Sequence, residues 1–548
     1  MKIPLTRGGS RGKAALVSQR TLKFAVIVLF FGVSALWFGK LSSAQLIDRT
    51  KNPNTVNAGI GRSFADQVGT GRGDLATVGS SAFIIGRDPF RSIRRGRQLF
   101  QRKFLRTQGA GPIADDLILG GNIETSLRIG AGLSDSCASC HGRPRGSAGF
   151  GGDVVTRPES RDAPHLFGLG LKEMLADEIT ADLRAIKASA ISQAAATHKD
   201  VTKDLKSKGI SYGSITASPD GSVNTAGVQG VDADLRVRPF FHHGGTISIR
   251  EFIVGAFNDE MGLQAVDPQL KAAHDGGTYT TPSGMVLNGA TDQISAPLAL
   301  NDAHDEDGDG IANEIPTSAV DHMEFYLLNY FKPAHGEQTQ SVKKGLDTFK
   351  EVGCAQCHIP DLKIQRDRRV ADVETVYDTD NGNFNSLFAT ATPLINSVPD
   401  SSGFDPVKVP KRQPFMVENI LTDLKRHDLG RNFYERNYDG SYQTMFMTTP
   451  LWGVGSTPPY GHDGRSMTLM DVIMRHGGEA LAARNAFAAK NRNKQQEVIE
   501  FLNSLILFPP DDTASNLDPG DRSDPRFPQY GQGSIKLTAL FNNPMDPE

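Results

Sequence analysis

The chain has few cysteines, almost no net charge and no long hydrophobic run. It holds only four cysteines in 548 residues, and its formal net charge is −3. So small a charge gives no reason to expect nucleic acid or an anionic membrane as a partner. Glycine (57 residues) and proline (30 residues) are abundant instead, which predicts many loops and modest helix content. With 38% hydrophobic residues, the chain can still bury a real core.

The first 44 residues have the order of an export signal. They contain no acidic residue, and a basic start is followed by an apolar run over 24–38 and by small residues that end at Ala44. That order predicts a signal peptide over 1–44, cleaved after Ala44. The apolar run is shorter than the about 20 residues of a membrane span, and an uncleaved anchor to the inner membrane is the alternative. Both predict that the rest of the chain is periplasmic or secreted.

All four cysteines lie in two C-x-x-C pairs, and each pair is followed at once by histidine. The residues are Cys137, Cys140 and His141 in the first half, and Cys354, Cys357 and His358 in the second. Two disulfides are the plain alternative in an exported protein, but they would not require the histidines. A redox-active pair would need no histidine either, and no other cysteine remains for a zinc site.

The pattern C-x-x-C-H is typical of covalent haem attachment. The two thiols add to the two vinyl groups of haem, and the next residue places an imidazole under the iron. Two such motifs use every cysteine of the chain. They predict two haem c groups, with His141 and His358 as ligands of the two irons.

Helical patterns precede both motifs. Val342, Leu346, Phe349 and Val352 recur at helical spacing before the second motif, as in the first helix of a cytochrome c. A similar stretch, residues 94–100, precedes the first motif at a greater distance. Its charge predicts a solvated face, with a docking face as the alternative. The basic residues of this region are Arg91, Arg94, Arg95, Arg97, Arg102, Lys103 and Arg106.

A second pattern recurs downstream of each motif. One copy spans 239–252 and the other 459–472, and the two align without gaps. Each copy predicts a turn at His-x-Gly that leads into a helix, with Ser248 or Thr468 near the N-cap. The repetition predicts two related haem lobes.

These features predict a mainly α fold with irregular loops, two cytochrome c-like haem lobes and small β-hairpin insertions. Within the first lobe, the Ala- and Lys-rich segment 176–208 predicts a surface helix, and 211–237 predicts a β-hairpin. The expected domains are 1–44 as signal peptide or anchor, 45–335 as the N-terminal lobe, 336–510 as the C-terminal lobe and 511–548 as an extended tail.

The motifs resemble the bacterial di-haem cytochrome c peroxidase superfamily, which includes the methylamine-utilisation di-haem enzymes and, in the wider group, the rubber oxygenases. The resemblance covers most of 88–510, and its strongest piece is TPLWGVGSTPPYGHDG at 449–464. The patterns LTDLKRHDLG at 421–430 and HGGEA at 476–480 look most like the di-haem oxidoreductase branch.

The resemblance implies a second ligand for the second iron. The family has an axial position on the helix after the His-Asp-Gly turn, and that position falls on His476 here. A His/His iron would be low-spin and of lower potential than a His/Met iron. The alternatives are a capping histidine before Gly477, or Met474 or Met470 as the ligand.

The resemblance also implies an acid/base group beside the first iron. The family's peroxidatic lobe carries Glu-Met after its turn and helix, which corresponds to Glu260 and Met261 here, with Phe257 nearby. A carboxylate beside an open iron can move a proton between the two oxygens of peroxide. The alternative is an ordinary solvated acid near a helix end.

Two departures from the family concern the first iron. Many members hold a removable distal histidine shortly after the first motif, and the corresponding residues 151–157 contain none. This predicts a permanently open site. His242 stands where the family has an inter-haem tryptophan, which puts a tryptophan route for electron holes in doubt. His242 or His243 as a second ligand of the first iron is the alternative, and it would close that site.

Two calcium sites are expected. The acidic loop 305–314 resembles an EF-hand-like loop, although Pro316 occupies the position of its usual last glutamate. A bare solvated turn is the alternative. The candidate ligands are Asp305, Asp307, Asp309, Ile311, Asn313 and Glu314. The family's inter-haem calcium maps onto Asp162, Thr457 and Pro459.

The sequence therefore predicts an exported oxidoreductase with two haem c groups and calcium. Its first haem would reduce hydrogen peroxide with electrons that the second haem relays from a periplasmic donor, either a small cytochrome, a cupredoxin or a quinol-linked protein. The alternatives are an oxygenase that uses O2 on an apolar substrate, and a non-catalytic electron carrier.

Overall fold

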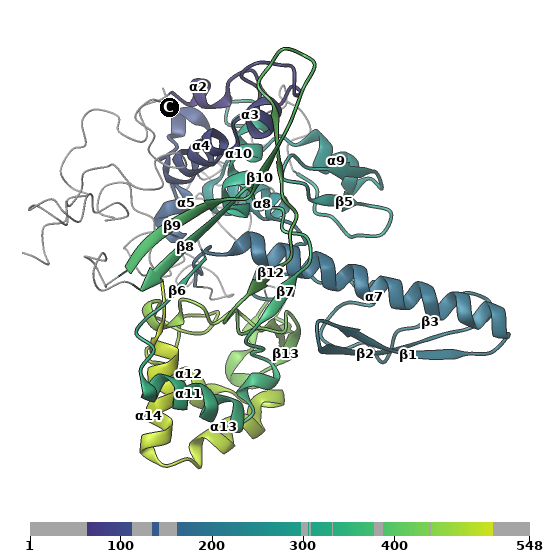
Figure 1. The fold of residues 1–548 in the computed structure, drawn as a ribbon, viewed down its shortest axis with the longest axis vertical. Coiled ribbons are helices and arrows are strands. Elements are labelled where there is room, and N and C mark those ends of the chain that lie inside the picture. Colours follow the sequence, from purple (N-terminus) through teal and green to yellow (C-terminus); the bar gives the residue numbers. More distant parts are fainter. Residues whose placement is uncertain are drawn as a thin grey trace, which may run out of the picture. The chain divides into compact units, whose positions relative to one another are not determined.

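The computed structural model describes residues 63–111, 134–141, 162–297, 305, 308–330, 332–377, 387–437 and 440–507 (Figure 1). All of them belong to one compact unit, Thr55–Glu548. The predicted signal segment, Asp307, the stretch 151–157 and the tail 511–548 lie outside the described residues. No described helix is both long and apolar enough to cross a bilayer.

Helices frame the first C-x-x-C-H motif. Helix α4 begins after Asp88, whose side chain accepts a hydrogen bond from the Arg91 backbone N–H, and Pro89 takes its first position. The helices of this part are α2 (Phe64–Val68), α3 (Ser81–Arg87), α4 (Pro89–Gln101), α5 (Cys137–His141), α8 (Ile249–Met261), α9 (Pro268–His274) and α10 (Thr317–Leu328).

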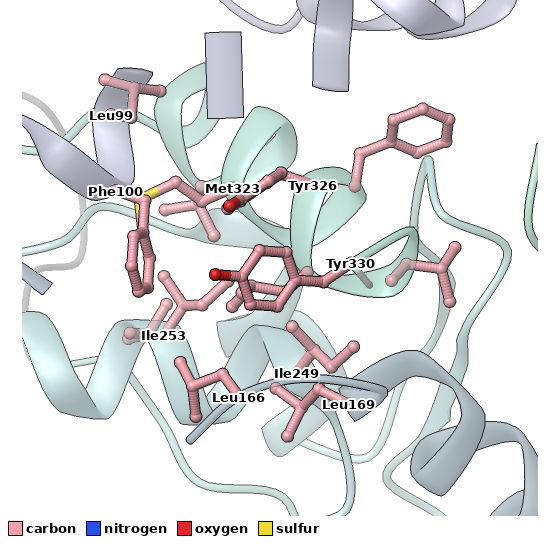
Figure 2. Packing of buried hydrophobic residues seen from close by; sticks show 14 of the residues in the cluster. Leu99, Phe100, Leu166, Leu169, Ile249, Ile253, Met323, Tyr326 and Tyr330 are labelled. Carbon is pink, nitrogen blue, oxygen red and sulfur yellow. The ribbon is translucent and has the colours of Figure 1, made fainter. Parts of the chain in front are cut away.

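Helices α4, α8 and α10 share one hydrophobic core. Figure 2 shows Phe100 of α4 with Met323 and Tyr326 of α10 and Ile253 of α8. All four side chains are almost completely buried, and burial of such side chains contributes about 1.5–3 kcal/mol each. Cys137 packs against this core, so the core holds the first motif in place.

A buried ion-pair network joins α8 to α10. Arg250 of α8 is fully buried and lies 2.9 Å from Asp321 and 2.7 Å from Glu324, both on α10. It also pairs with Asp267. Removal of one partner from such a network leaves an unpaired buried charge, at a cost of about 3–5 kcal/mol. The network therefore fixes α8, the helix that carries Phe257 and Glu260.

The long helix α7 (Leu169–Thr197) packs on a three-stranded antiparallel sheet, β1 (Val201–Ser207), β2 (Ile210–Ala217) and β3 (Val223–Asn224) (Figure 1). The prediction of a helix up to residue 208 is wrong at its end. His198 adopts a left-handed conformation (φ 53°) and ends the helix, and residues 201–207 alternate in burial as a strand. The predicted hairpin is confirmed around the tight turn at Gly221, which joins β2 to β3.

The second C-x-x-C-H motif follows α11 (Gln340–Glu351), which packs against α14 (Arg492–Asn503). Thr339 caps α11 through the Val342 N–H, and the helix buries the face that contains Val342 and Phe349. The apolar periodicity before the second motif is therefore confirmed as a helix. The remaining helices are α12 (Leu469–Arg475) and α13 (Leu481–Ala488).

Small antiparallel pairs complete the structure, so the described fold is mixed α/β rather than mainly α. Short strands join distant segments, such as residues 334–335 with 505–506. The pairs are β4 (Thr278–Thr280) with β5 (Val286–Asn288), β6 (Ala334–His335) with β17 (Leu505–Ile506), β7 (Leu362–Ile364) with β12 (Phe415–Val417), β8 (Ala371–Tyr377) with β9 (Leu387–Pro393), β10 (Ile395–Val398) with β11 (Val407–Pro410), β13 (Arg426–Asp428) with β16 (Met445–Met447), and β14 (Glu435–Arg436) with β15 (Tyr442–Gln443).

The prediction of a solvated basic face on α4 is wrong. Arg94, Arg95 and Arg97 are only 3–5% exposed. Arg95 Nη1 donates a hydrogen bond to the carbonyl of Gln67 at 3.2 Å. The guanidinium groups are buried because α4 is covered by neighbouring segments, which charge alone does not reveal.

Candidate functional site

One cavity of about 690 Å³ is lined by both C-x-x-C-H motifs. His141 ends α5, and Cys354 begins a short 3-10 helix after α11. Most other lining residues are apolar, among them Phe240, Phe252 and Phe446. Such a lining suits a large planar hydrophobic group with few polar edges.

The two motif histidines are oriented in the same way. The Nδ1–H of His141 donates to the carbonyl of Pro164 at 2.6 Å, and that of His358 donates to the carbonyl of Leu421 at 3.0 Å. Each bond fixes the tautomer and leaves a lone pair on Nε2, which is how proteins prepare a histidine to bind iron. Burial lowers the pKa of both imidazoles, that of His358 to about 4, so both stay neutral near pH 7.

All four cysteines lie within the described residues and are thiols rather than disulfides. Burial raises the pKa of Cys137 to about 12 and that of Cys354 to about 11. A raised pKa keeps these two thiols protonated near pH 7, which argues against a redox-active thiolate at either motif.

The helix before each motif crosses a second helix at very short range. A Cβ at Gly96 of α4 would lie 2.1 Å from the carbonyl oxygen of His322 on α10, and one at Gly345 of α11 would lie 2.0 Å from that of Glu497 on α14. Four residues after each glycine comes a phenylalanine, Phe100 or Phe349, that lines the cavity. Sequence reasoning noticed the similar stretches but missed these two glycines, whose shared Gly-x-x-x-Phe spacing was the available signal.

The predicted turn-helix repeat is confirmed residue by residue. Phe240 pairs with Thr246 in the first copy, and Tyr460 pairs with Ser466 in the second, each through an isolated antiparallel bridge. The side chain of Ser248 caps α8 and that of Thr468 caps α12, as expected. The two copies therefore place equivalent residues at equivalent points of the cavity wall.

The two copies differ at two positions that face the cavity. Continued without gaps, the alignment sets Ala256 of α8 against His476, and Glu260 of α8 against Ala480. All four residues line the cavity. One site thus has an imidazole where the other has a methyl group, and a carboxylate where its counterpart has none. This exchange could not be read from the aligned segments alone, because it lies beyond them.

His476 has the same orientation device as the motif histidines. It follows the last residue of α12, and its Nδ1–H donates to the carbonyl of Val472 at 2.7 Å. Its ring lies edge-on to Phe433 at 5.2 Å, and burial lowers its pKa. His476 lines the same cavity as His358 and is close enough to contribute to the low pKa of His358, so a neutral imidazole held in this way can serve as an axial ligand. Of the alternatives, Met474 is 39% exposed, and neither Met474 nor Met470 is among the residues that line the cavity. The bond to the Val472 carbonyl is also the one that a capping histidine would make, so that alternative stays open.

The two residues predicted to act at the first site lie on one helix. Phe257 is 1% exposed and packs edge-on against Phe104 at 6.0 Å. Glu260 lies in the last turn of α8, four residues after Ala256 and therefore on the same helical face. Both residues line the cavity. The structure thus brings Glu260 to the cavity together with His141.

His242 lines the cavity beside its counterpart in the repeat, His462. Its Nε2 is 3.1 Å from the carbonyl oxygen of Asp162, and its ring lies 5.8 Å from that of His462. His462 stacks on Phe446 at 4.1 Å. His242 lines the cavity, while His243 is stacked 6.5 Å from Phe241. The Nε2 atom of His242 is thus in contact with the Asp162 carbonyl. Nε2 is the atom that would bind iron if His242 were an axial ligand.

His427 is a buried histidine whose role sequence reasoning missed. Its Nε2 lies 2.9 Å from Asp423 and its Nδ1 lies 2.8 Å from Glu479. Burial alone would lower its pKa, but hydrogen bonds with Asp423, Cys357 and Glu479 outweigh burial and raise the pKa to about 11. The Asp-x-x-x-His spacing at 423–427 was the available signal. This cluster ties β13 to the residues after His476, beside the second motif.

The candidate calcium ligands of the loop 305–314 differ in their surroundings. Asp305 Oδ1 accepts hydrogen bonds from the backbone of Gly308 (2.7 Å) and Asp309 (3.2 Å), as in a tight acidic loop. Glu314 is 4% exposed, and its Oε2 accepts a hydrogen bond from the Gln264 backbone N–H at 2.7 Å. Ile311 and Asn313 continue the loop, with Asn313 in a left-handed conformation (φ 54°).

The three inter-haem calcium candidates meet at the cavity. Asp162, Thr457 and Pro459 all line it, and the Asp162 N–H donates to the carbonyl of His462 at 2.6 Å. Asp162 and Thr457 are buried.

A family match agrees with the resemblance. Residues 386–505 match the family described as "Di-haem oxidoreductase, putative peroxidase", which confirms the similarity to the di-haem peroxidase superfamily. The matched segment contains His427, His462 and His476. Among solved structures, hydrazine synthase from Kuenenia stuttgartiensis, studied under xenon pressure, is similar at 16% identity and a TM-score of 0.21. That similarity covers 35% of this chain and 56% of the other. No curated protein matches the chain.

Proposed function

We propose that the protein is an exported di-haem c-type oxidoreductase that reduces hydrogen peroxide at the site of His141, with electrons relayed through the site of His358. The observation that carries this proposal is the unequal pair of sites on one cavity wall. Ala256 leaves the first site without an axial side chain at the position that His476 fills in the second, and Glu260 stands only at the first. The match to a di-haem oxidoreductase family supports the same class of reaction.

The residues around the first site have separate tasks in this reaction. A haem held by Cys137, Cys140 and His141 would supply an iron that binds peroxide and exchanges electrons with it. Glu260 would accept a proton from one oxygen of the peroxide and return it to the other, so that the O–O bond breaks with water as the leaving group. Phe257 keeps bulk water from this face. Peroxide takes up two electrons and two protons in all and gives two molecules of water.

The second site has the task of electron transfer. His358 and His476, each held by a backbone carbonyl, would both hold the haem attached at Cys354 and Cys357. A haem held by two histidines would supply electron transfer rather than peroxide binding. We propose a small cytochrome, a cupredoxin or a quinol-linked protein as the periplasmic donor, in line with the export signal at 1–44.

An oxygenase that acts on an apolar substrate is the second candidate. The aromatic lining around the first motif, with Phe240, Phe241 and Phe252, favours it, because an apolar substrate needs such a wall. Consumption of O2 with an apolar polyene, and no turnover of peroxide, would select this candidate.

Electron paramagnetic resonance of the ferric protein tests the proposal. We expect one high-spin signal from the open first haem, which changes on addition of peroxide, and one low-spin signal that does not. Two low-spin signals that are indifferent to peroxide would refute the proposal and leave a non-catalytic electron carrier.

Substitution of Glu260 tests the proton transfer. Glu260→Gln keeps the size of the side chain and removes the base, and we expect the turnover of peroxide to fall by about 10²–10⁴-fold. Asp204→Asn is the control, since it removes an exposed carboxylate of β1 that is not among the residues lining the cavity. Equal activity of Glu260→Gln and the wild type would remove Glu260 from the mechanism.

A further inference from the structure

Lys172 is a cation on the wall of an otherwise largely apolar cavity. It lies in the first turns of α7 and lines the same cavity as the two C-x-x-C-H motifs. Its Nζ lies 5.7 Å from the centre of the Phe240 ring. Among the described residues, no carboxylate lies within ion-pair distance of this ammonium group.

The position of Lys172 is unfavourable for a positive charge on two counts. It is the fourth residue of a 29-residue helix, and the N-terminal end of a helix carries partial positive charge. Burial also disfavours the charged form and lowers its pKa to about 8. Both effects are relieved if an anion occupies the cavity beside the ammonium, and the N-terminus of α7 would favour the same anion.

A haem is itself the source of such an anion. It carries two propionate groups, and an apolar pocket can take them only if cations or hydrogen-bond donors meet them. Only two lysine or arginine side chains of the described residues line the cavity, Lys172 and Arg484. Arg484 belongs to α13, near the second motif, and donates to the carbonyl of Met474 at 3.3 Å. In the part of the chain that the structure describes, Lys172 is the cation that remains for the first motif.

Ring contacts place Lys172 near the first motif. The Phe240 ring that it faces lies 6.0 Å from Phe252, and Phe252 lies 6.3 Å from His141. The charge of Lys172 also contributes to the low pKa of His165, after the larger effect of burial. His165 directly follows Pro164, whose carbonyl holds His141.

We propose that the ammonium group of Lys172 binds a propionate of the haem attached at Cys137 and Cys140. The inference rests on the proposed function, because it requires that haem. It assigns to Lys172 the role of a positioning residue, which holds the edge of the first haem and places a positive charge beside it. That charge favours the reduced, more negative state of the haem and so raises its reduction potential.

Substitution of Lys172 in the full-length protein with both haems tests the proposal. Resonance Raman spectra report the propionate bending modes, and a potentiometric titration followed by paramagnetic resonance separates the two haems. For Lys172→Met we expect a shifted propionate mode and a lower midpoint potential of the high-spin haem alone. Lys172→Arg should keep a potential close to that of the wild type, because it retains the charge. Lys187→Met is the matched control, since Lys187 lies on the same helix about 22 Å further along its axis.

The outcomes separate this proposal from the proposed function. Wild-type protein whose mass shows no covalently bound haem would refute the proposed function. Protein with two haems, in which Lys172→Met changes neither the propionate mode nor the potential, would refute only the role of Lys172. A shift confined to the low-spin haem would overturn the assignment to the first haem. If Lys172→Met fails to fold, Lys172→Gln makes the same test, since it keeps a hydrogen-bond donor and loses the charge.

Discussion

Alanine at Gly345 provides the sharpest test of how closely α11 packs against α14. A Cβ there would lie 2.0 Å from the Glu497 carbonyl oxygen and 2.8 Å from the Cβ of Phe501, both fixed parts of α14. The helices must separate by roughly 1 Å before the contact is tolerable, and such overpacking costs about 1–3 kcal/mol. Separation also weakens the edge-on contact between Phe349 and Phe501 at 5.5 Å, worth about 0.5–1.5 kcal/mol.

Helix propensity opposes this packing cost, so the sign of the change in the free energy of unfolding distinguishes a tight crossing from a loose one. Glycine inside a helix is about 0.5–1 kcal/mol less favourable than alanine. Gly345→Ala would therefore stabilise a loosely packed α11, whereas the observed crossing predicts a net loss of about 1–3 kcal/mol in the free energy of unfolding. Urea denaturation followed by circular dichroism measures the difference.

The matched control for Gly345 is Gly255 on α8. A Cβ at Gly255 would meet nothing nearer than the Asp259 carboxylate at 4.0 Å. Gly255→Ala should therefore stabilise the protein by about 0.5–1 kcal/mol. Wild-type or greater stability of Gly345→Ala would refute the tight crossing. A destabilised Gly255→Ala would show that helix propensity had been misjudged, and the comparison would then carry no weight.

Two further predictions concern the second half of the chain. His476→Met should raise the midpoint potential of the low-spin haem, because thioether ligation favours the reduced iron. An unchanged potential together with an unchanged low-spin spectrum would show that His476 is not a ligand. Glu351 has its pKa lowered to about 2 by hydrogen bonds from Lys490 and then Lys494. Its stabilising effect is therefore complete above the unfolded pKa of about 4.5 and is lost as the pH falls towards 2. The stability difference between the wild type and Glu351→Gln should shrink from pH 7 to pH 3 and with added salt, and a constant difference would contradict this.

Local signals were the predictable part of this fold. The C-x-x-C-H spacing, the apolar period before Cys354 and the caps at Ser248 and Thr468 are all set within a few residues of chain. Capping and amphipathic helices depend on neighbours at i+3 and i+4, so a single sequence contains the information. The repeat was visible for the same reason, since its turn residues are fixed by backbone geometry.

Contacts between distant segments were not predictable. The carbonyls that orient His141 and His358 lie 23 and 63 residues further along the chain, and every peptide unit has such a carbonyl. Arg94, Arg95 and Arg97 are buried because other segments cover α4. Their charge alone had predicted that they would be exposed to solvent. The end of α7 at His198 was missed because Ala and Lys content favours a helix, while Val201 and Thr202 enter a sheet whose partner strand decides the outcome.

The difference between the two sites comes from where each helix after the repeated turn ends. Helix α8 continues to Met261 and ends with Gly262 in a left-handed conformation (φ 61°). Glu260 is therefore still on a helical face that lines the cavity. Helix α12 ends at Arg475, and the chain then turns at Gly478 (φ 47°), where a Cβ would lie 2.1 Å from the Asp428 carbonyl oxygen.

The end of α12 at Arg475 places His476 on the cavity wall. The Gly477 N–H donates to the carbonyl of Leu429 at 2.9 Å, so the chain is anchored to β13 directly after the histidine. Glu479 then reaches His427. Side chains at Gly477 or Gly478 would push the turn away from β13 and carry His476 with it. Under the proposed function, the closure of the second site would therefore depend on two glycines as much as on the histidine, and the open first site would depend on a helix that has no such break.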